Sequence, residues 1–488
     1  MEFNEILPLI MSEVEKHPEI TEAEGYVSRN STTMVRIETL RYGRKKFGPE
    51  AQQLKTIETS GIGVRIVVGK SMGTATTSYF TVGAIKLAIY SALKNAKRME
   101  ADPNYKHLVK DVGKQKGKLP YDKKIYKGAV EDDLIKAAEA ATSVVDQNNL
   151  DLAGKIMTVS QEFSVANTNG VEVDNDIDTF IVAQLTGEKL KGADIVSSGV
   201  GWHSARLAKD LDAEKAAVDA LEPARITPKL KKVDEGDYSV ILSPYAVSDI
   251  IDNMMASAFT LGSIYMGMSW LPVERKKLFN EKDALFPKMD EMVASELITF
   301  RDDPLIKDGM SSKNYDDEGV PTSKHTLIEK GQWKDVLADS YYSFLYELGK
   351  PGNGFRTDLV PGRCAGALPS DSGTNMILEP GDMSFDELVE VAEGPTLVLP
   401  RTWYTYPTRY GAPTFSSSNR STSFLVDKGE LVPVAPNAFK LIGDIRTILN
   451  EVMGIGKEVQ GATTWAASQS TIAPHLATKG IRVEKSHF

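Results

Sequence analysis

Apolar residues recur at helical spacing in three segments of the first half of the chain. The first is the opening stretch MEFNEILPLIMSEVEKHPEI, and the second runs from Thr81 to Arg98. The third, Glu131 to Val145, begins with acidic residues that suit the positive end of a helix dipole. We predict an amphipathic helix over each segment, and a further charged helix over roughly Ser204 to Leu221.

Between these helices the pattern changes to that of β-strands. Residues 63–68 (GVRIVV) form a short apolar run, and residues 156–185 alternate apolar and polar positions on both sides of Asn169-Gly170. An Asn-Gly pair between two alternating runs is a strong signal for a β-hairpin. The first half is therefore expected to combine helices with a sheet.

The second half contains one long apolar segment, Val247 to Leu271, rich in methionine. Pro244 suits a first helical position and Ser243 can cap it, so a helix is predicted to begin there. Asp249 and Asp252 fall in its first turns, which favours a buried helix of a soluble domain over a membrane span.

An acid-Lys-Gly sequence occurs twice in the second half, each time between strand-like runs. One copy ends the segment Leu327 to Gly331, and the other ends Leu425 to Gly429. Glycine supplies the positive φ that short reversals need, so both copies predict β-hairpins.

These patterns predict an α+β fold in two parts. Residues 224–238 form a polar connector containing proline and glycine, and we place the domain boundary at its start. The prediction is an N-terminal α+β domain over residues 1–223 and a β-rich C-terminal domain over residues 224–488, which contains the buried Met-rich helix.

Composition narrows the function classes. The net charge is −10, and the 57 Lys and Arg residues are scattered among 67 acids, so no basic stripe predicts direct nucleic-acid binding. The one cysteine, Cys364, excludes an intramolecular disulfide framework and favours a reducing compartment. The first twenty residues lack a basic leader pattern, so a cytoplasmic location without membrane attachment is expected.

Several candidate motifs fail on their spacing. GVRIVVGKS (Gly63–Ser71) resembles a phosphate-binding loop but has one residue too many between its glycines. No two histidines are close enough to bind one metal ion from adjacent helical turns. Cys364 lies in a Gly/Pro-rich loop and would be nucleophilic only if an imidazole lay nearby, which the sequence leaves open.

Three adjacent acids, Asp316, Asp317 and Glu318, precede Gly319 in the stretch NYDDEGVPTSKHTLIEKGQ. They could bind a cation or a substrate amine, or form a polar turn in which Asp side chains accept hydrogen bonds from nearby backbone N–H groups. Adjacent residues of a strand point to opposite faces, so we favour the structural turn over a catalytic centre. On that interpretation, removing one bond costs about 0.5–2 kcal/mol.

The same region carries a resemblance to a known family. The chain resembles the TldD/PmbA family, described as modulators of DNA gyrase and zinc-dependent proteases, in Tyr315–Thr322, in Leu327–Gly331, and in Gly352-Asn353-Gly354 followed by Arg356. Weaker matches occur in order along the rest of the chain, among them Gly61–Arg65 and Leu441–Asp444. The resemblance implies a metallopeptidase scaffold acting in proteolysis.

The chain departs from that family at its metal site. The metal-bearing members carry HExxxH on the helix that corresponds to the one predicted at Pro244, with a cysteine near the C-terminus. This chain has no histidine between His203 and His325, and no cysteine in GATTWAASQSTIAPHLATKG. It therefore resembles the PmbA/TldE-like branch, and the resemblance implies no metal ligand or catalytic residue here, with zinc expected in a partner subunit.

Two functional hypotheses follow. The first is a non-catalytic subunit that forms a heterodimer with a metal-bearing TldD-like relative, or a homodimer, and acts on unstructured peptides. The second is an autonomous hydrolase that uses the acidic turn, His325 or Cys364. For the first hypothesis, we predict that the loop with Asn353, Gly354 and Arg356 lines a peptide-binding groove, because glycines let backbone approach closely and arginine binds carboxylates.

Overall fold

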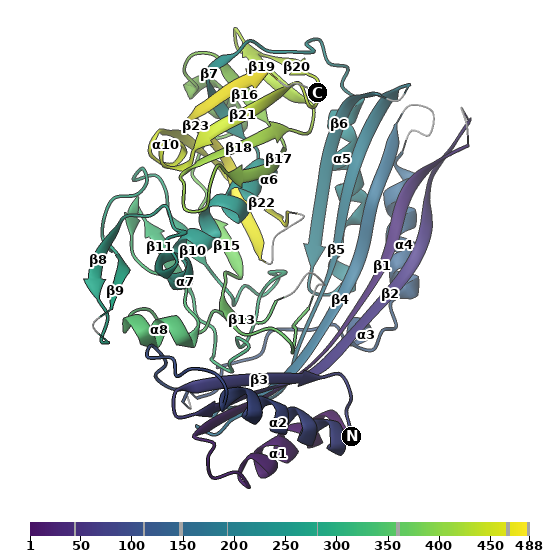
Figure 1. Cartoon of the computed structure of the whole chain (residues 1–488). Coiled ribbons are helices and arrows are strands. Elements are labelled where there is room, and N and C mark those ends of the chain that lie inside the picture. Colours follow the sequence, from purple (N-terminus) through teal and green to yellow (C-terminus); the bar gives the residue numbers. More distant parts are fainter. Residues whose placement is uncertain are drawn as a thin grey trace.

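The computed structural model describes residues 1–42, 45–110, 113–145, 150–192, 194–280, 282–357, 362–464 and 469–485. It has the predicted α+β fold, with one large sheet in each half of the chain and these two sheets facing each other (Figure 1); β8 with β9 and β13 with β14 form two further small sheets in the second half. No described helix has the length and apolar character needed to cross a membrane.

The first half forms a six-stranded antiparallel sheet in the order β3-β2-β1-β4-β5-β6. Its elements are α1 (Phe3–Val14), β1 (Glu22–Tyr42), β2 (Lys45–Val68), β3 (Ser71–Thr77), α2 (Val82–Ala96), α3 (Lys123–Tyr126), α4 (Glu131–Ser143), β4 (Asp151–Asn167), β5 (Glu172–Lys191), β6 (Asp194–Ala205) and α5 (Ala213–Arg225).

The two faces of this sheet have different roles. In β1, Ala23, Val27, Val35 and Ile37 pack against helices α1, α2, α4 and α5. Because side chains alternate along a strand, the residues between them, such as Glu24, Tyr26 and Arg36, point to the opposite face. Figure 1 shows that this second face is turned toward the second half of the chain.

The second half is organised around a larger mixed sheet, with β12-β11-β10-β15-β23-β7-β16-β19-β20 as its main path. Its elements are β7 (Gly236–Leu242), α6 (Pro244–Ile250), α7 (Leu261–Tyr265), β8 (Val273–Lys277), β9 (Asp283–Pro287), β10 (Phe300–Asp302), β11 (His325–Glu329), β12 (Gln332–Trp333), α8 (Ser340–Tyr346), β13 (Gly354–Phe355), β14 (Ser370–Asp371), β15 (Asn375–Leu378), α9 (Phe385–Val391), β16 (Thr396–Leu399), β17 (Thr402–Pro407), β18 (Thr414–Asn419), β19 (Ser423–Asp427), β20 (Glu430–Val434), β21 (Phe439–Asp444), α10 (Ile445–Asn450), β22 (Val452–Ala462) and β23 (Ser470–Lys485).

Both acid-Lys-Gly sequences form the predicted hairpins. Glu329 pairs with Gln332 and Asp427 pairs with Glu430, so each loop consists of Lys and Gly alone. The φ angles are 47° and 80° at Lys330 and Gly331, and 51° and 81° at Lys428 and Gly429. Two central residues with positive φ match the type I′ turn that suits the twist of a hairpin.

The predicted Met-rich helix is buried but not continuous. Helix α6 passes into a π-helical turn at Ile251–Met255, then a 3₁₀ turn at Ala256–Phe259, and the chain breaks at Thr260 before α7. Thr260 caps α7 by accepting a hydrogen bond from the Ser263 N–H, while Ser243 makes no capping bond to α6. The helix predicted to begin at Pro244 is therefore interrupted before Thr260, which caps a separate short helix.

Two other predicted elements differ from the structure. The charged helix predicted from Ser204 begins at Ala213, because β6 continues to Ala205 and Asp212 provides the N-cap by accepting from the Lys215 N–H. The strand predicted at residues 63–68 is the end of the 24-residue β2. The helices predicted over 81–98 and 131–145 and the hairpin at Asn169-Gly170 are confirmed.

Candidate functional site

The acidic turn lies buried between the two halves of the chain. Asp316 makes the local bonds of a turn: its Oδ1 accepts from the N–H groups of Glu318 (3.0 Å) and Val320 (2.9 Å). Gly319 has a φ of 82°, and a Cβ there would lie 2.5 Å from Val171 on the first sheet. The turn is therefore pressed directly against the hairpin between β4 and β5.

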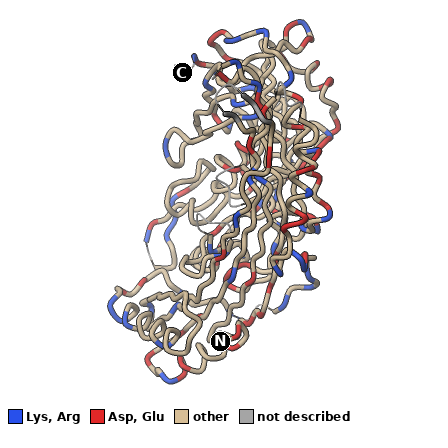
Figure 2. The backbone as a smooth tube through the Cα atoms, turned by 90° about the vertical axis from the view of Figure 1, so that its right-hand side faces the viewer, with Lys and Arg blue, Asp and Glu red and all other residues tan. Residues whose placement is uncertain are grey.

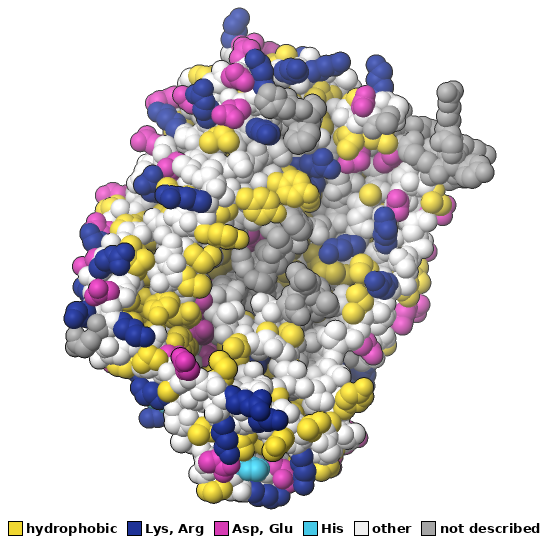
Figure 3. All heavy atoms as spheres, in the orientation of Figure 1, with side chains coloured by type: hydrophobic (Ala, Val, Ile, Leu, Met, Phe, Trp, Pro, Cys, Tyr) yellow, Lys and Arg dark blue, Asp and Glu magenta, His cyan; other side chains and the backbone are white. Residues whose placement is uncertain are grey.

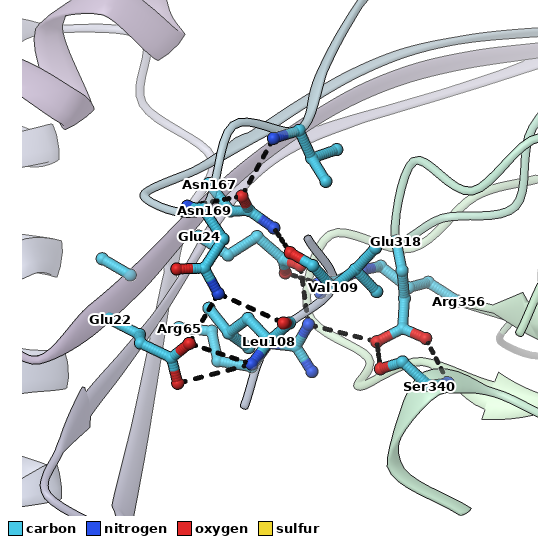
Figure 4. Close-up of polar contacts among 12 residues, drawn as sticks. Glu22, Glu24, Arg65, Leu108, Val109, Asn167, Asn169, Glu318, Ser340 and Arg356 are labelled. Atoms are coloured by element: carbon cyan, nitrogen blue, oxygen red, sulfur yellow. Dashed lines mark hydrogen bonds and ion pairs between the residues drawn. The ribbon is translucent and has the colours of Figure 1, made fainter. Parts of the chain in front are cut away.

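Asp317 and Glu318 point away from the turn and across to the first sheet. Asp317 Oδ1 accepts from the Tyr26 hydroxyl (2.7 Å) and pairs with Arg363, and its Oδ2 accepts from the Arg356 N–H (2.6 Å). Glu318 lies 3.3 Å from Arg65 of β2 and also accepts from the hydroxyl and N–H of Ser340. Figure 4 shows Glu318 reaching Arg65 from the opposite side of the junction.

The predicted peptide-binding residues lie at the same junction and are buried. The Arg356 guanidinium pairs with Glu24 of β1, donates to the Ala367 carbonyl (2.8 Å) and stacks 4.4 Å from the centroid of the Tyr26 ring. Asn353 donates to Asp302 (3.1 Å), and a Cβ at Gly354 would lie 2.7 Å from Glu318. In this conformation Arg356 pairs across the junction with Glu24, while Asn353 and Gly354 are covered by residues of their own half, so all three are closed to a peptide.

Sequence reasoning missed a second group of charges beside the turn. Asp178 of β5 binds Lys313 (2.9 Å), Arg206 (3.2 Å) and Arg363 (3.2 Å), and all four side chains are buried or nearly so. Arg363 also lies 3.9 Å from the centroid of the Phe163 ring. Pairs separated by up to 185 residues leave no local pattern, so nothing in the sequence pointed to this cluster.

Burial and charge shift the pKa values of these acids in opposite directions. Burial raises the pKa of Asp316 well above its usual range, and the neighbouring Glu318 adds to the effect. Burial also opposes ionisation of Asp178, but Lys313, Arg363 and Arg206 together hold its pKa below the usual range. The junction thus consists of closely matched buried charges. Removing one charged side chain from a pair would leave its partner buried with less compensating charge.

Helix α6 and the π-helical turn that follows it occupy the position where the resemblance places a metal site, and their side chains do not fit zinc. Asp249 Oδ2 accepts from the hydroxyls of Thr402 (2.7 Å) and Thr405. Asp252 accepts from Gln469 (3.0 Å) and Thr471 (3.0 Å). Hydrogen-bond donors from the protein thus hold both carboxylates, and no group of three or more His, Cys, Asp or Glu suited to a metal ion occurs among the described residues.

Two other candidate residues have defined surroundings. His325 Nδ1 lies 2.9 Å from Asp335 Oδ2, and its Nε2 lies 3.4 Å from Ser323 Oγ, in the order of a nucleophile, base and acid. His325 is only 2 % exposed. Cys364 is half-buried beside a pocket of about 220 Å³ whose described lining contains no histidine. His487 lies outside the described residues.

Two larger pockets, each of about 480 Å³, lie where the open face of the first sheet meets the second half. One is lined by residues of β1, β2, β4, β5 and β6 together with Arg401 and Trp403. The other lies between β6, Pro244 and strands β22 and β23, and contains His203 and His475. Figure 3 shows hydrophobic side chains along the upper border of the hollow between the halves.

The fold and the site are those of a chain with two facing sheets and a buried acidic turn between its halves. The chain belongs to this family: the domain described as "PmbA/TldA metallopeptidase C-terminal domain" matches residues 235–485. A metalloprotease of Methanocaldococcus jannaschii is 24% identical over 431 residues, covering 85% of this chain and 87% of the relative.

Solved structures share the fold at lower identity. The crystal structure of TldE from Thermococcus kodakarensis superposes with a TM-score of 0.77 at 20% identity, covering 98% of this chain and 99% of that one. A Bacteroides thetaiotaomicron protein that carries the name modulator of DNA gyrase gives a TM-score of 0.76 at 18% identity, with 99% and 98% covered. These likenesses establish the fold of the whole described chain.

Proposed function

We propose that this chain is the non-catalytic subunit of a peptidase assembly that degrades unstructured peptides in the cytoplasm. Its partner is a metal-bearing relative of the same family that carries the zinc ion. The proposal rests on the residues of α6 and the π-helical turn that follows it. The segment that bears HExxxH in metal-bearing members here carries Asp249 and Asp252. Both of these carboxylates are held by hydroxyl and amide groups of the same chain.

The remaining scaffold supports a binding role. The fold is retained over the whole described chain, and two pockets of about 480 Å³ lie along the junction between the halves. This size falls in the range of pockets that bind small ligands or a few residues of a peptide. A subunit of this kind contributes an interface and part of the substrate-binding surface, while the bond is broken at the partner's metal.

The experiment mixes this chain with the HExxxH-bearing relative from the same genome and measures mass and zinc content. We expect a stable complex of one copy of each chain on gel filtration with light scattering, with its zinc bound by the relative. A homodimer that excludes the relative would contradict the heterodimer, and about one zinc per isolated chain after mild chelation would contradict the non-catalytic role.

A second candidate function, an autonomous hydrolase, rests on the contacts of His325 with Ser323 on one side and Asp335 on the other. These residues line none of the three pockets described above, and the Ser323–His325 separation of 3.4 Å is long for proton transfer. Peptidase activity of the isolated chain that is lost in Ser323→Ala but resists chelators would favour this function instead.

A further inference from the structure

The open face of the first sheet carries basic side chains where it meets the second half. Val35 and Ile156 pack against the helices behind the sheet, so the neighbouring Arg36 and Lys155 point to the open face. Together with Lys55 of β2 they line one wall of a pocket of about 480 Å³, and Arg401 approaches from the other side. The lining contains four basic residues and, among the described residues, no acidic one.

Among the described residues, Arg401 differs from the other buried arginines because no carboxylate pairs with it. Arg401 is only 7 % exposed, and its Nε has no hydrogen-bond acceptor among the described residues. Burial lowers its pKa and the charge of Arg420 adds to this effect, while Tyr245, Asp249 and Glu188 oppose it through their charge. By contrast, Arg65, Arg356 and Arg363 each pair with a carboxylate.

The surroundings of Arg401 fix its position and leave its N–H groups available. Its guanidinium lies 4.5 Å from the centroid of the Trp403 ring and 5.5 Å from that of Tyr245, so it is held by aromatic contacts. The next residue, Thr402, donates to Asp249 of α6 (2.7 Å). Strand β17 then has an irregular register between Trp403 and Tyr406, with Tyr404 at a φ of 55°. Such irregularities in strands commonly re-aim side chains at functional sites.

We propose that this pocket binds a carboxylate of a peptide substrate, with Arg401 as its principal ligand. A buried, unpaired guanidinium is costly, and a bound carboxylate removes that cost by accepting two parallel N–H bonds. Lys155 lies on the opposite wall and adds positive charge, and its burial lowers its pKa. Gln184 and Thr186 supply neutral polar groups suited to peptide backbone.

The inference rests on the proposed function for the source of the carboxylate, which is a peptide rather than a free metabolite. The carboxylate can belong to the C-terminus or to an acidic side chain, and the two share the same recognition chemistry. Inorganic phosphate would also match a guanidinium, so it is included as a competing probe.

The test is calorimetric titration of the full chain with three versions of one unstructured ten-residue peptide. The first has a free C-terminal carboxylate, the second a C-terminal amide and no acid, and the third an amide with one internal Glu. We expect the amide without acid to bind at least about ten-fold more weakly than a carboxylate-bearing version, since charged hydrogen bonds of this kind contribute about one to two orders of magnitude.

Variants of Arg401 test whether this side chain is the group that binds the carboxylate. Arg401→Gln should reduce binding of the carboxylate peptide to the level of the amide, while Arg401→Lys should retain part of the difference. Arg482→Gln is the matched control, because Arg482 is exposed, pairs with Asp237 (3.4 Å) and does not line this pocket. Since Arg401→Gln removes an unpaired buried charge, its melting temperature should equal or exceed that of the unmodified chain.

Each remaining outcome decides the inference. The inference is wrong if all three peptides bind equally, if none binds at millimolar concentration, or if Arg401→Gln binds as the unmodified chain does. If phosphate displaces the peptide and acetate does not, the pocket is a phosphate site instead. Carboxylate-dependent binding without any complex with the metal-bearing relative would support the pocket and refute the subunit role. A functional complex with Arg401-independent binding would do the reverse.

Discussion

Asp317 contacts both halves of the chain, since Tyr26 belongs to the first half and Arg356 and Arg363 to the second. One carboxylate accepts from the Tyr26 hydroxyl, pairs with Arg363 and accepts from the Arg356 N–H, and the residue is 1 % exposed. The local-turn interpretation accounts for Asp316 but not for these contacts. The energetic role of Asp317 is therefore that of a buried ion-pair partner.

We expect Asp317→Asn to destabilise the protein by about 3–5 kcal/mol, because it removes one of the two carboxylates that pair with buried Arg363 and leaves only Asp178 at 3.2 Å. This exceeds the 0.5–2 kcal/mol expected for a simple turn bond. Urea unfolding measures the change, and Asp237→Asn, at an exposed ion pair, is the control that should leave stability nearly unchanged. A loss below about 1 kcal/mol for Asp317→Asn would show that the junction does not depend on this charge.

Asp252 makes stability depend on pH. Burial raises its pKa to about 7, against the opposing effect of hydrogen bonds from Thr464, Thr471 and Gln469. The folded state therefore holds a proton that the unfolded chain, with a pKa of about 4, has released. The stability from this group is complete below about pH 4 and is lost as the pH rises to about 7.

The variant Asp252→Asn removes that titration. Between pH 4 and pH 7 the unmodified chain should lose stability relative to this variant, whatever the offset between them at low pH. Unfolding midpoints in urea across this range give the difference. Asp290→Asn, at a surface ion pair with Lys334, should follow the unmodified chain at every pH. Parallel curves for the Asp252 variant and the unmodified chain would refute the assignment.

At this scale the sequence predicted the residues of the turn but not their partners. Asp316, Gly319 and the hairpin that follows are neighbours in sequence, and turn chemistry describes them. Tyr26 is 291 residues from Asp317, and Glu24 is 332 residues from Arg356. Contacts of that separation depend on how the two sheets dock, which no short pattern encodes.

Among the elements, the two Lys-Gly hairpins offer a matched comparison. Both glycines have a φ near 80°, but a Cβ at Gly331 would lie 2.3 Å from the Ala294 carbonyl, while one at Gly429 would meet nothing within 4 Å. Gly429→Ala should therefore cost only the backbone strain, about 1–2 kcal/mol. Gly331→Ala should cost clearly more. Equal losses in chemical unfolding would mean that the backbone near Ala294 yields freely.

The elements that the pattern predicted well are those with one buried face. Helix α2 has apolar residues at regular spacing because a core lies on one side, and the hairpin of β4 and β5 is marked by its Asn169-Gly170 turn although β4 is buried on both faces near it. Most of the long strand β2 was missed because residues 51–60 are almost all exposed and lie beyond the reach of β3, which pairs only with Ile62–Val68. Without a buried face there is no alternation to detect.

Seen as a whole, the molecule places its charge in two different settings. On the surface, acids and bases are interspersed without a single-sign stripe (Figure 2). At the junction, by contrast, acids and bases from both halves form buried pairs. A junction of matched charges fixes one arrangement of the two sheets and so preserves the pockets between them. The PmbA/TldD fold is thus retained here with an α6 segment that does not fit zinc.

The most direct test of the subunit role is a titration of peptidase activity. A fixed amount of the HExxxH-bearing relative is incubated with an unstructured peptide and increasing amounts of this chain. The account predicts that cleavage rises until the two chains are equimolar, then stays constant, and is abolished by a chelator, while this chain alone cleaves nothing. Full activity of the relative without this chain, or chelator-resistant cleavage by this chain alone, would contradict it.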